Sequence, residues 1–265
     1  MRSSNGRAPP TCASEVIALV IALGIVVGAV MGLVGAGGGI ISVPALVGLV
    51  GVPVADAMTA SLVMAIASAS TAVVPRLRGG IDWPVAAAVS GAGIPAALVG
   101  TAVNALLPQS LLLIGFGALM LVAGVRMLRP LTDTASSGER QPRWLIHAIL
   151  IGLGVGMLTG LLGVGGGFVI VPALALLLRL PMKLSIGTSL VVTVANSLAG
   201  AAAHASIGGI DVPLTVAFTI PAMIASLLGA RLAAKLPGKG LQIGFAVLVL
   251  VIAVVTLVAT IIPLT

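Results

Sequence analysis

The chain has 265 residues, of which 59% are hydrophobic and 7% are charged. A water-soluble domain carries roughly a quarter charged residues, so this composition excludes an ordinary soluble globular protein. The formal net charge is +7, but the basic residues lie at the ends of long apolar stretches and between them. That placement is typical of topology-setting charges in a membrane protein and not of a nucleic-acid-binding surface.

Seven uncharged stretches follow one another along the chain, and each is long enough to cross a bilayer, which needs about 20 apolar residues. They cover residues 16–55, 57–75, 83–125, 144–178, 184–210, 212–230 and 240–265. The first, third and fourth are long enough for more than one membrane element each. The third divides at residues 104–108, because Pro108 starts a helix more readily than it continues one. We expect an all-α polytopic membrane protein.

Residues 1–15 form a predicted polar tail. The apolar run that follows lacks a small-residue cleavage site leading into a soluble domain, so we interpret it as a retained helix and not as a signal peptide. Cys12 is the single cysteine of the chain. One cysteine excludes an internal disulfide framework and indicates no metal site, and we expect no cofactor.

The two halves of the chain share one sequence pattern. GLVGAGGGIISVPAL at residues 32–46 aligns without gaps with GLLGVGGGFVIVPAL at residues 160–174, an offset of 128. The match continues through Ser61 and Ser189 and, after a shift of one residue, pairs two Gly-Gly-Ile-Asp segments. We interpret this self-similarity as a duplication. The predicted organisation is a tail at 1–15, a four-helix repeat at 16–129, a polar linker at 130–143 and a second four-helix repeat at 144–265.

These paired Gly-x-x-Gly-x-Gly-Gly-Gly segments, each followed by Val-Pro-Ala-Leu, resemble the TauE/SafE sulfite exporter family of bacterial permeases. Ser61, the pair Thr188–Ser189 and the Gly-Gly-Ile-Asp segments add to the resemblance, which covers nearly the whole chain. It implies about eight transmembrane helices in two four-helix halves. It also implies transport of sulfite, sulfonates or related anions, and we expect the protein in the inner membrane of a bacterium.

The basic residues offer a separate test of topology. With eight strictly alternating spans they divide eight to five between the two sides, which is a weak positive-inside bias. If each glycine-rich stretch crosses once more, the division becomes eleven to two, and the two halves are inverted relative to each other. The segments after the triple glycines have about 12 to 15 residues, which suits re-entrant or broken half-helices. We expect eight full helices and two such elements.

The glycine clusters are the strongest functional signal. Three adjacent glycines disfavour a helix, and the backbone groups that they free must be buried in protein or line a cavity. Successive N–H groups at such a turn, followed by a helix N-terminus, form a concavity that suits an anion. The alternative is that these glycines serve only close helix packing. The predicted substrate-binding glycines are Gly37, Gly38, Gly39, Gly165, Gly166 and Gly167.

Few polar side chains are available to face such a site. Hydroxyl and amide groups suit an oxyanion, because they replace its hydration without placing a full charge in lipid. The alternative for each is a hydrogen bond to its own or a neighbouring helix. The predicted binding residues are Thr59, Ser61, Thr188, Ser189 and Asn196, with Ser68, Ser70 and Thr193 as further candidates.

Titratable groups are scarce in the apolar stretches. His147 and His204 are the histidines of the chain, and His204 is a candidate proton relay if transport is coupled to protons. An interfacial or hydrogen-bonded histidine is the alternative. Asp82 and Asp211 each precede a residue followed by Pro, which predicts helix capping.

The function that these features favour is a secondary transporter of small anions, working by alternating access between two repeats. A passive pore or a non-transporting scaffold subunit is the alternative. The motifs of membrane-embedded enzymes do not occur, so we expect no catalytic residues. The expected partners are a small anion and the lipid bilayer, with no nucleic acid, and a homodimer is an open option.

Overall fold

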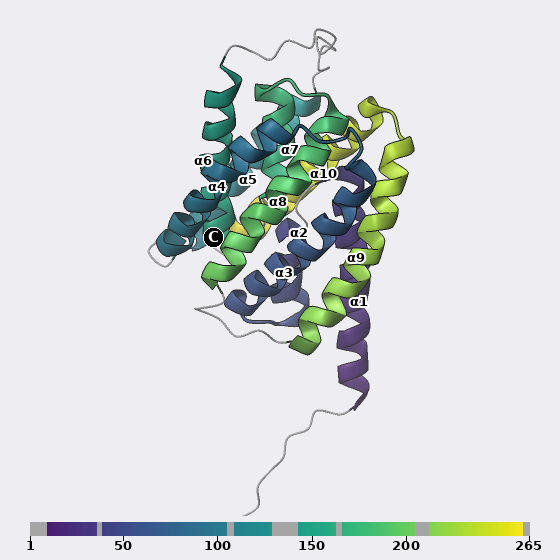
Figure 1. Ribbon diagram of the computed structural model, residues 1–265. Helices are drawn as coiled ribbons and strands as arrows, with labels where there is room; N and C mark the ends of the chain where they lie inside the picture. The colour runs from purple at the N-terminus through teal and green to yellow at the C-terminus, as the bar shows by residue number, and fades with distance from the viewer. Residues whose placement is uncertain are drawn as a thin grey trace, which may run out of the picture.

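The computed structural model describes residues 10–35, 39–104, 109–128, 143–162, 166–204 and 212–261, and every regular element in those residues is helical (Figure 1). Within these described residues, seven helices are long and apolar enough to cross a membrane, which confirms the predicted polytopic all-α class. The elements are α1 (Pro10–Val34), α2 (Gly39–Ala45), the π-helix η1 (Leu46–Val50), α3 (Val54–Val73), the 3-10 turn η2 (Val74–Arg76), α4 (Trp83–Asn104), α5 (Gln109–Leu128), α6 (Trp144–Leu162), α7 (Gly167–Leu177), α8 (Met182–His204), α9 (Val212–Lys235) and α10 (Gly238–Ile261).

Helix boundaries follow local chemistry. The apolar part of α1 is Val16–Val34, but the helix begins at Pro10, inside the predicted tail. A proline in the first turn of a helix loses no hydrogen bond there, so the helix extends beyond its apolar part. At the start of α4, Oδ1 of Asp82 accepts a hydrogen bond of 3.2 Å from the backbone N–H of Val85, which confirms the predicted cap.

Two parallel helix pairs form the sides of the bundle. Helix α1 packs along α9, and α4 packs along α6. In the first pair, the position of a Cβ added to each of three glycines of α1 falls against the backbone of α9. The paired residues are Gly24 with Phe218, Gly28 with Ala222, and Gly32 with Ser226. Residue numbers rise together along both helices, so the two run in the same direction, and only glycine permits so close an approach.

The second pair is built in the same way. Three glycines of α6 approach the backbone of α4, and the paired residues are Gly152 with Val89, Gly156 with Gly93, and Gly160 with Ala97. Each glycine of this set lies 128 residues after its counterpart in α1. Both pairs therefore join a helix from the first half of the chain to a helix from the second half.

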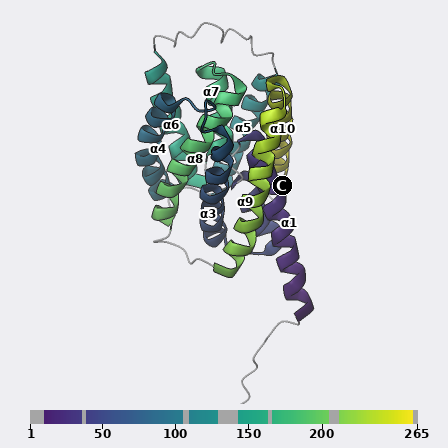
Figure 2. The same ribbon diagram turned by 45° about the vertical axis from the view of Figure 1, so that its right-hand side comes forward.

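Helices α3 and α8 lie between these pairs, with α4 and α6 on one side and α1 and α9 on the other (Figures 1 and 2). They are the most buried of the seven candidate spans, with 61% and 56% of their windows buried. The two are antiparallel, because Gly200 of α8 lies against Leu62 of α3, whereas Gly187, near the start of α8, lies against Gly80 after the end of α3. The α3–α8 pair is therefore the centre of the molecule.

The directions of the helices show how often the chain crosses the bundle. Arg76, at the end of α3, donates a hydrogen bond of 3.0 Å to the carbonyl oxygen of Gly32, near the end of α1. Helices α1 and α3 thus end on the same side of the bundle, and the chain between them returns across it through α2 and η1. The antiparallel α3–α8 arrangement excludes strict alternation of eight spans, which would make these two helices parallel.

The helix ends that carry the described basic residues gather at one end of the bundle, which we call the basic end; it is at the top of Figure 1. It holds the ends of α3, α5 and α9 and the starts of α6, α8 and α10. Within the described residues, the basic residues there are Arg76, Arg78, Arg126, Arg143, Arg179, Lys183, Arg231, Lys235 and Lys239. By the positive-inside rule this end is expected to face the cytoplasm.

Candidate functional site

The glycine breaks interrupt the chain beside α8. Gly35 ends α1 with a φ of 68°, and Gly166 precedes α7 with a φ of 65°, a left-handed conformation that favours glycine. Gly39 and Gly167 are the first residues of α2 and α7. Three other predicted binding glycines, Gly37, Gly38 and Gly165, lie outside the described residues.

The two breaks are packed against different helices, the first against α8 and the second against α6. A Cβ on Gly35 would lie 2.6 Å from Cγ2 of Ile186 and 3.1 Å from Oγ of Ser189. Gly166 abuts Val155 and Thr159 of α6, and the methyl group of Thr159 lies against Gly200 of α8. The first break therefore lies against the first half of α8, whereas the second reaches the last turns of α8 only through Thr159 of α6.

Between these approaches lies a group of buried polar side chains that we call the α3–α8 polar cluster. Its members are Ser61 and Ser68 of α3 and Thr193, Asn196 and Ser197 of α8. All five residues are 0% exposed, and their hydroxyl and amide atoms have no hydrogen-bond partner in the protein. Buried polar groups are almost always paired, so these atoms require a partner that the chain itself does not supply.

Helical spacing places the members from each helix on a shared face of that helix. Residues 193, 196 and 197 fall on one face of α8, and residues 61 and 68 are seven apart on one face of α3. The amide of Asn196 also touches α4, because a Cβ on Gly93 would lie 2.5 Å from Oδ1 and 2.7 Å from Nδ2. Gly93 therefore leaves the room that the amide occupies.

The structure divides the predicted polar residues into two groups. Ser61 and Asn196 belong to the polar cluster, whereas Thr188 and Ser189 have protein partners. Oγ1 of Thr188 accepts a 2.9 Å bond from the N–H of Asp82, and Oγ of Ser189 donates to the carbonyl of Ile186 at 2.7 Å and lies 3.2 Å from that of Gly35. Those bonds give both residues a structural role beside the glycine break.

The remaining candidates lie apart from the cluster or carry local bonds. Thr59 is buried near the start of α3 and has its own polar interaction. Ser70 is exposed and donates to the carbonyl of Ile66 in the same helix. Nδ1 of His147 lies 2.9 Å from the carbonyl oxygen of Arg143, which fits the hydrogen-bonded interpretation. The side chain of His204 and all of Asp211 lie outside the described residues.

A second polar group joins α3 to α9, and we call it the α3–α9 hydroxyl network. Oγ of Ser226 and Oγ1 of Thr71 lie 2.7 Å apart. Ser226 also lies within hydrogen-bonding distance of the carbonyls of Ser68 and Met223, at 3.0 and 2.9 Å. Both hydroxyls are thus paired within the protein, in contrast to the neighbouring cluster.

Two members of the unpaired set, Ser197 and Thr219, do not follow from the repeat pattern. Ser197 is adjacent to Asn196 and shares a helical face with Thr193, and that spacing is the signal by which it is recognisable. Thr219 of α9 is buried and also lacks a partner. Among the described residues, no group of three His, Cys, Asp or Glu side chains has the geometry to hold a metal ion.

The described part of the chain is thus a polytopic helical bundle with buried polar side chains that lack protein partners on α3, α8 and α9. Residues 20–256 match the family described as Sulfite exporter TauE/SafE. The chain belongs to this family. The match includes most of α1, both glycine breaks, the α3–α8 polar cluster and most of α10, so TauE/SafE membership applies to nearly the whole bundle.

Curated relatives carry transporter names. A probable membrane transporter protein of Xylella fastidiosa is 31% identical over 163 residues, 60% of this chain and 62% of that protein. The probable membrane transporter proteins YdhB and YunE of Bacillus subtilis are 26% and 25% identical over 200 and 203 residues, which are 74% and 68% of this chain and 82% and 74% of theirs. No solved structure matches. The chain is therefore a multi-pass membrane protein of a transporter family, and the match spans under two thirds of the Xylella protein.

Proposed function

We propose that the protein is a secondary transporter of small anions in the bacterial inner membrane, with sulfite, an organosulfonate or a related oxyanion as substrate. The observation that carries the proposal is the α3–α8 polar cluster, which places six unpaired polar atoms at the centre of the bundle. Hydroxyl and amide groups bind an oxyanion without the desolvation penalty of a buried charge.

The arrangement of the helices supports alternating access. Each glycine-packed pair, α1 with α9 and α4 with α6, is a stiff unit, and the polar cluster lies on the two helices between these units. Movement of one unit relative to the other exposes the cluster first to one side and then to the other, as in other transporters with paired halves. The first glycine break, which lies next to α8, supplies backbone groups for the same substrate.

The test is sulfite flux in proteoliposomes that contain the purified protein. We expect saturable uptake that accelerates when unlabelled sulfite is present inside the vesicles, because a carrier returns faster when it is loaded. A passive pore shows no such acceleration, and a scaffold subunit shows no flux.

A matched pair of variants assigns the site. Thr193→Val removes an unpaired hydroxyl and keeps the shape of the side chain, whereas Thr101→Val removes a hydroxyl that donates to the carbonyl of Ala97 in its own helix. We expect Thr193→Val to raise the KM for sulfite about tenfold and Thr101→Val to leave it unchanged. Equal effects of the two substitutions would refute the assignment of the cluster as the binding site.

A further inference from the structure

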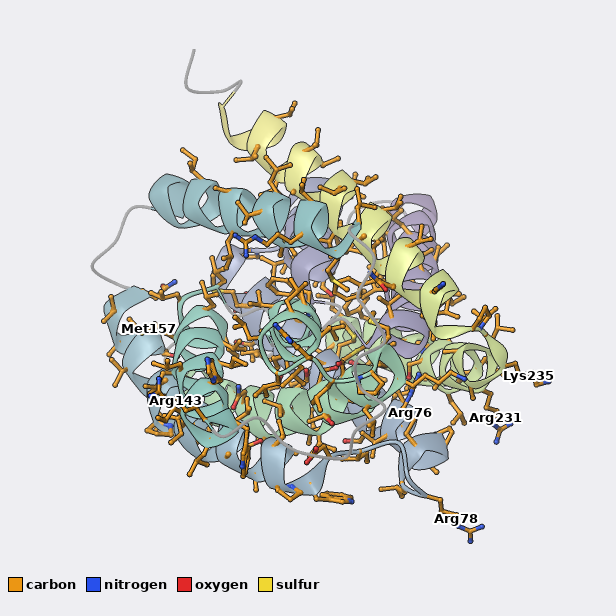
Figure 3. The ribbon with its side chains drawn as sticks, turned by 90° about the horizontal axis from the view of Figure 1, so that it is seen from above. Arg76, Arg78, Arg143, Met157, Arg231 and Lys235 are labelled. Carbon is orange, nitrogen blue, oxygen red and sulfur yellow. The ribbon has the colours of Figure 1, made fainter. Side chains whose placement is uncertain are left out.

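Arg76 differs from three of its basic neighbours at this end, Arg78, Arg231 and Lys235. It lies within the outline of the helices, whereas Arg78, Arg231 and Lys235 extend outward (Figure 3). Its Nη1 donates to the carbonyl of Ala72 at 2.9 Å, and its Nη2 donates to the carbonyl of Gly32 at 3.0 Å. The guanidinium group is therefore held in place, half-buried, between α3 and α1.

Both acceptors belong to the last turns of their helices. The C-terminus of a helix carries about half a negative charge, so the ends of α1 and α3 together present roughly one negative charge at this position. Among the described residues no carboxylate forms an ion pair with Arg76. The positive charge of Arg76 therefore offsets the partial negative charge of two helix ends, which would otherwise repel an anion.

Arg76 lies within a few helical turns of the α3–α8 polar cluster. Gly32 lies one turn before Gly35, whose carbonyl is 3.2 Å from Oγ of Ser189, and Ser189 lies one turn before Thr193 on α8. Along α3, Arg76 follows Ser68 by eight residues, which is about 12 Å of helix. That separation is too long for a shared ligand contact but short enough for an electrostatic effect where salt screening is incomplete.

We propose that Arg76 is the charge-selecting residue at the mouth of the transport path on the basic end. This inference rests on the proposed anion transport. Arg76 neutralises the C-terminal ends of α1 and α3 beside the first glycine break, so an anion that approaches the cluster from this end meets no net repulsion. Arg76 thus affects the rate at which an anion reaches the cluster, and it does not bind the anion as a ligand.

The test separates charge from hydrogen bonding. Arg76→Gln keeps N–H donors for a helix carbonyl and removes the charge, whereas Arg76→Lys keeps the charge and loses the planar fork. Arg78→Gln, two residues away and exposed, is the matched control. We expect Arg76→Gln to lower the initial rate of sulfite uptake about tenfold and to weaken its dependence on ionic strength. We expect Arg76→Lys to remain within about threefold of the wild type and Arg78→Gln to be unchanged.

The opposite pattern identifies a purely structural cap. If Arg76→Lys loses uptake while Arg76→Gln retains it, or if both fall together without a change in salt dependence, the inference is wrong. If Thr193→Val impairs uptake and Arg76→Gln does not, anion transport stands and the charge-selecting role fails. Absence of sulfite flux in the wild-type protein would overturn both proposals.

Discussion

The α3–α9 hydroxyl network and the α3–α8 polar cluster use the same kinds of side chain within the same part of the bundle, and Ser68 borders both. In the network, Thr71 and Ser226 are paired with each other and with carbonyls. In the cluster, hydroxyl and amide atoms at 0% exposure have no protein partner. An unpaired buried polar group costs about 1–3 kcal/mol, so the network contributes stability and the cluster reduces it. That difference is expected when one group holds helices together and the other binds a substrate.

Among substitutions that test the contrast between the two regions, Asn196→Leu should have the largest effect on sulfite transport. The substitution removes two unpaired polar atoms, so transport of sulfite should fall about 10- to 100-fold, because a hydrogen bond to a charged group contributes about 1.5–3 kcal/mol. The thermal unfolding midpoint should rise, since a buried unpaired amide is replaced by an apolar side chain. Flux and unfolding are measured on the same purified protein. Retained transport, or a lowered midpoint, would show that the amide serves the fold.

Gly93→Ala tests whether the position of the Asn196 amide matters, and it changes no polar side chain. The added Cβ would lie 2.5 Å from Oδ1 of Asn196, so the amide must move. We expect sulfite transport to fall about tenfold, as for a misplaced binding group. Gly91→Ala on the same helix is the control, because a Cβ there meets nothing within 4 Å. A similar loss in both variants would point to helix propensity and not to the position of the amide.

Ser226→Ala tests the other region. It removes the hydroxyl that bridges α9 and α3, so the free energy of unfolding should fall by about 0.5–2 kcal/mol. Sulfite transport, assayed below the unfolding temperature, should stay within about twofold of the wild type. If transport is lost while the protein remains folded, the network belongs to the binding site and the contrast between the two regions disappears.

The smallest effect is expected for Ser70→Ala. This hydroxyl is exposed and donates to the carbonyl of Ile66 within α3. Its removal should change the free energy of unfolding by no more than about 0.5 kcal/mol and leave sulfite transport unaltered. A larger change in either measurement would mean that the exposed face of α3 has a partner in the membrane.

How much of this structure the sequence predicts depends on the range of the interaction. The helical membrane class follows from composition, and the Asp82 cap follows from three adjacent residues, because both are local properties. The direction of α3 relative to α8 does not follow from span counting, since it depends on a return of the chain through short helices. The eleven-to-two division of basic residues predicted such a return crossing. In the structure, the described basic residues lie at the same end of the bundle, as that division requires.

The candidate site is only partly readable from the repeat pattern. Ser61 and Ser189 occupy equivalent positions, yet one is unpaired and the other lies within hydrogen-bonding distance of the carbonyls of Ile186 and Gly35. Whether a hydroxyl finds a partner depends on the neighbouring helix, which a pattern within one chain segment does not reveal. The repeat pattern does not predict Ser197 for the same reason, because its lack of a partner depends on how α8 packs against its neighbours.

The exchange of helices between the two halves has a consequence for biosynthesis. Helix α1 is synthesised well before α9, the helix against which its glycines pack. At a synthesis rate of roughly 5–20 residues per second, the glycine face of α1 remains without its partner in the bilayer for about ten seconds or longer. The most extensive helix pairs, α1 with α9, α4 with α6 and α5 with α10, each join the two halves, so these pairs form only after both halves have been inserted. A premature stop before α9 therefore leaves α1 without its main partner.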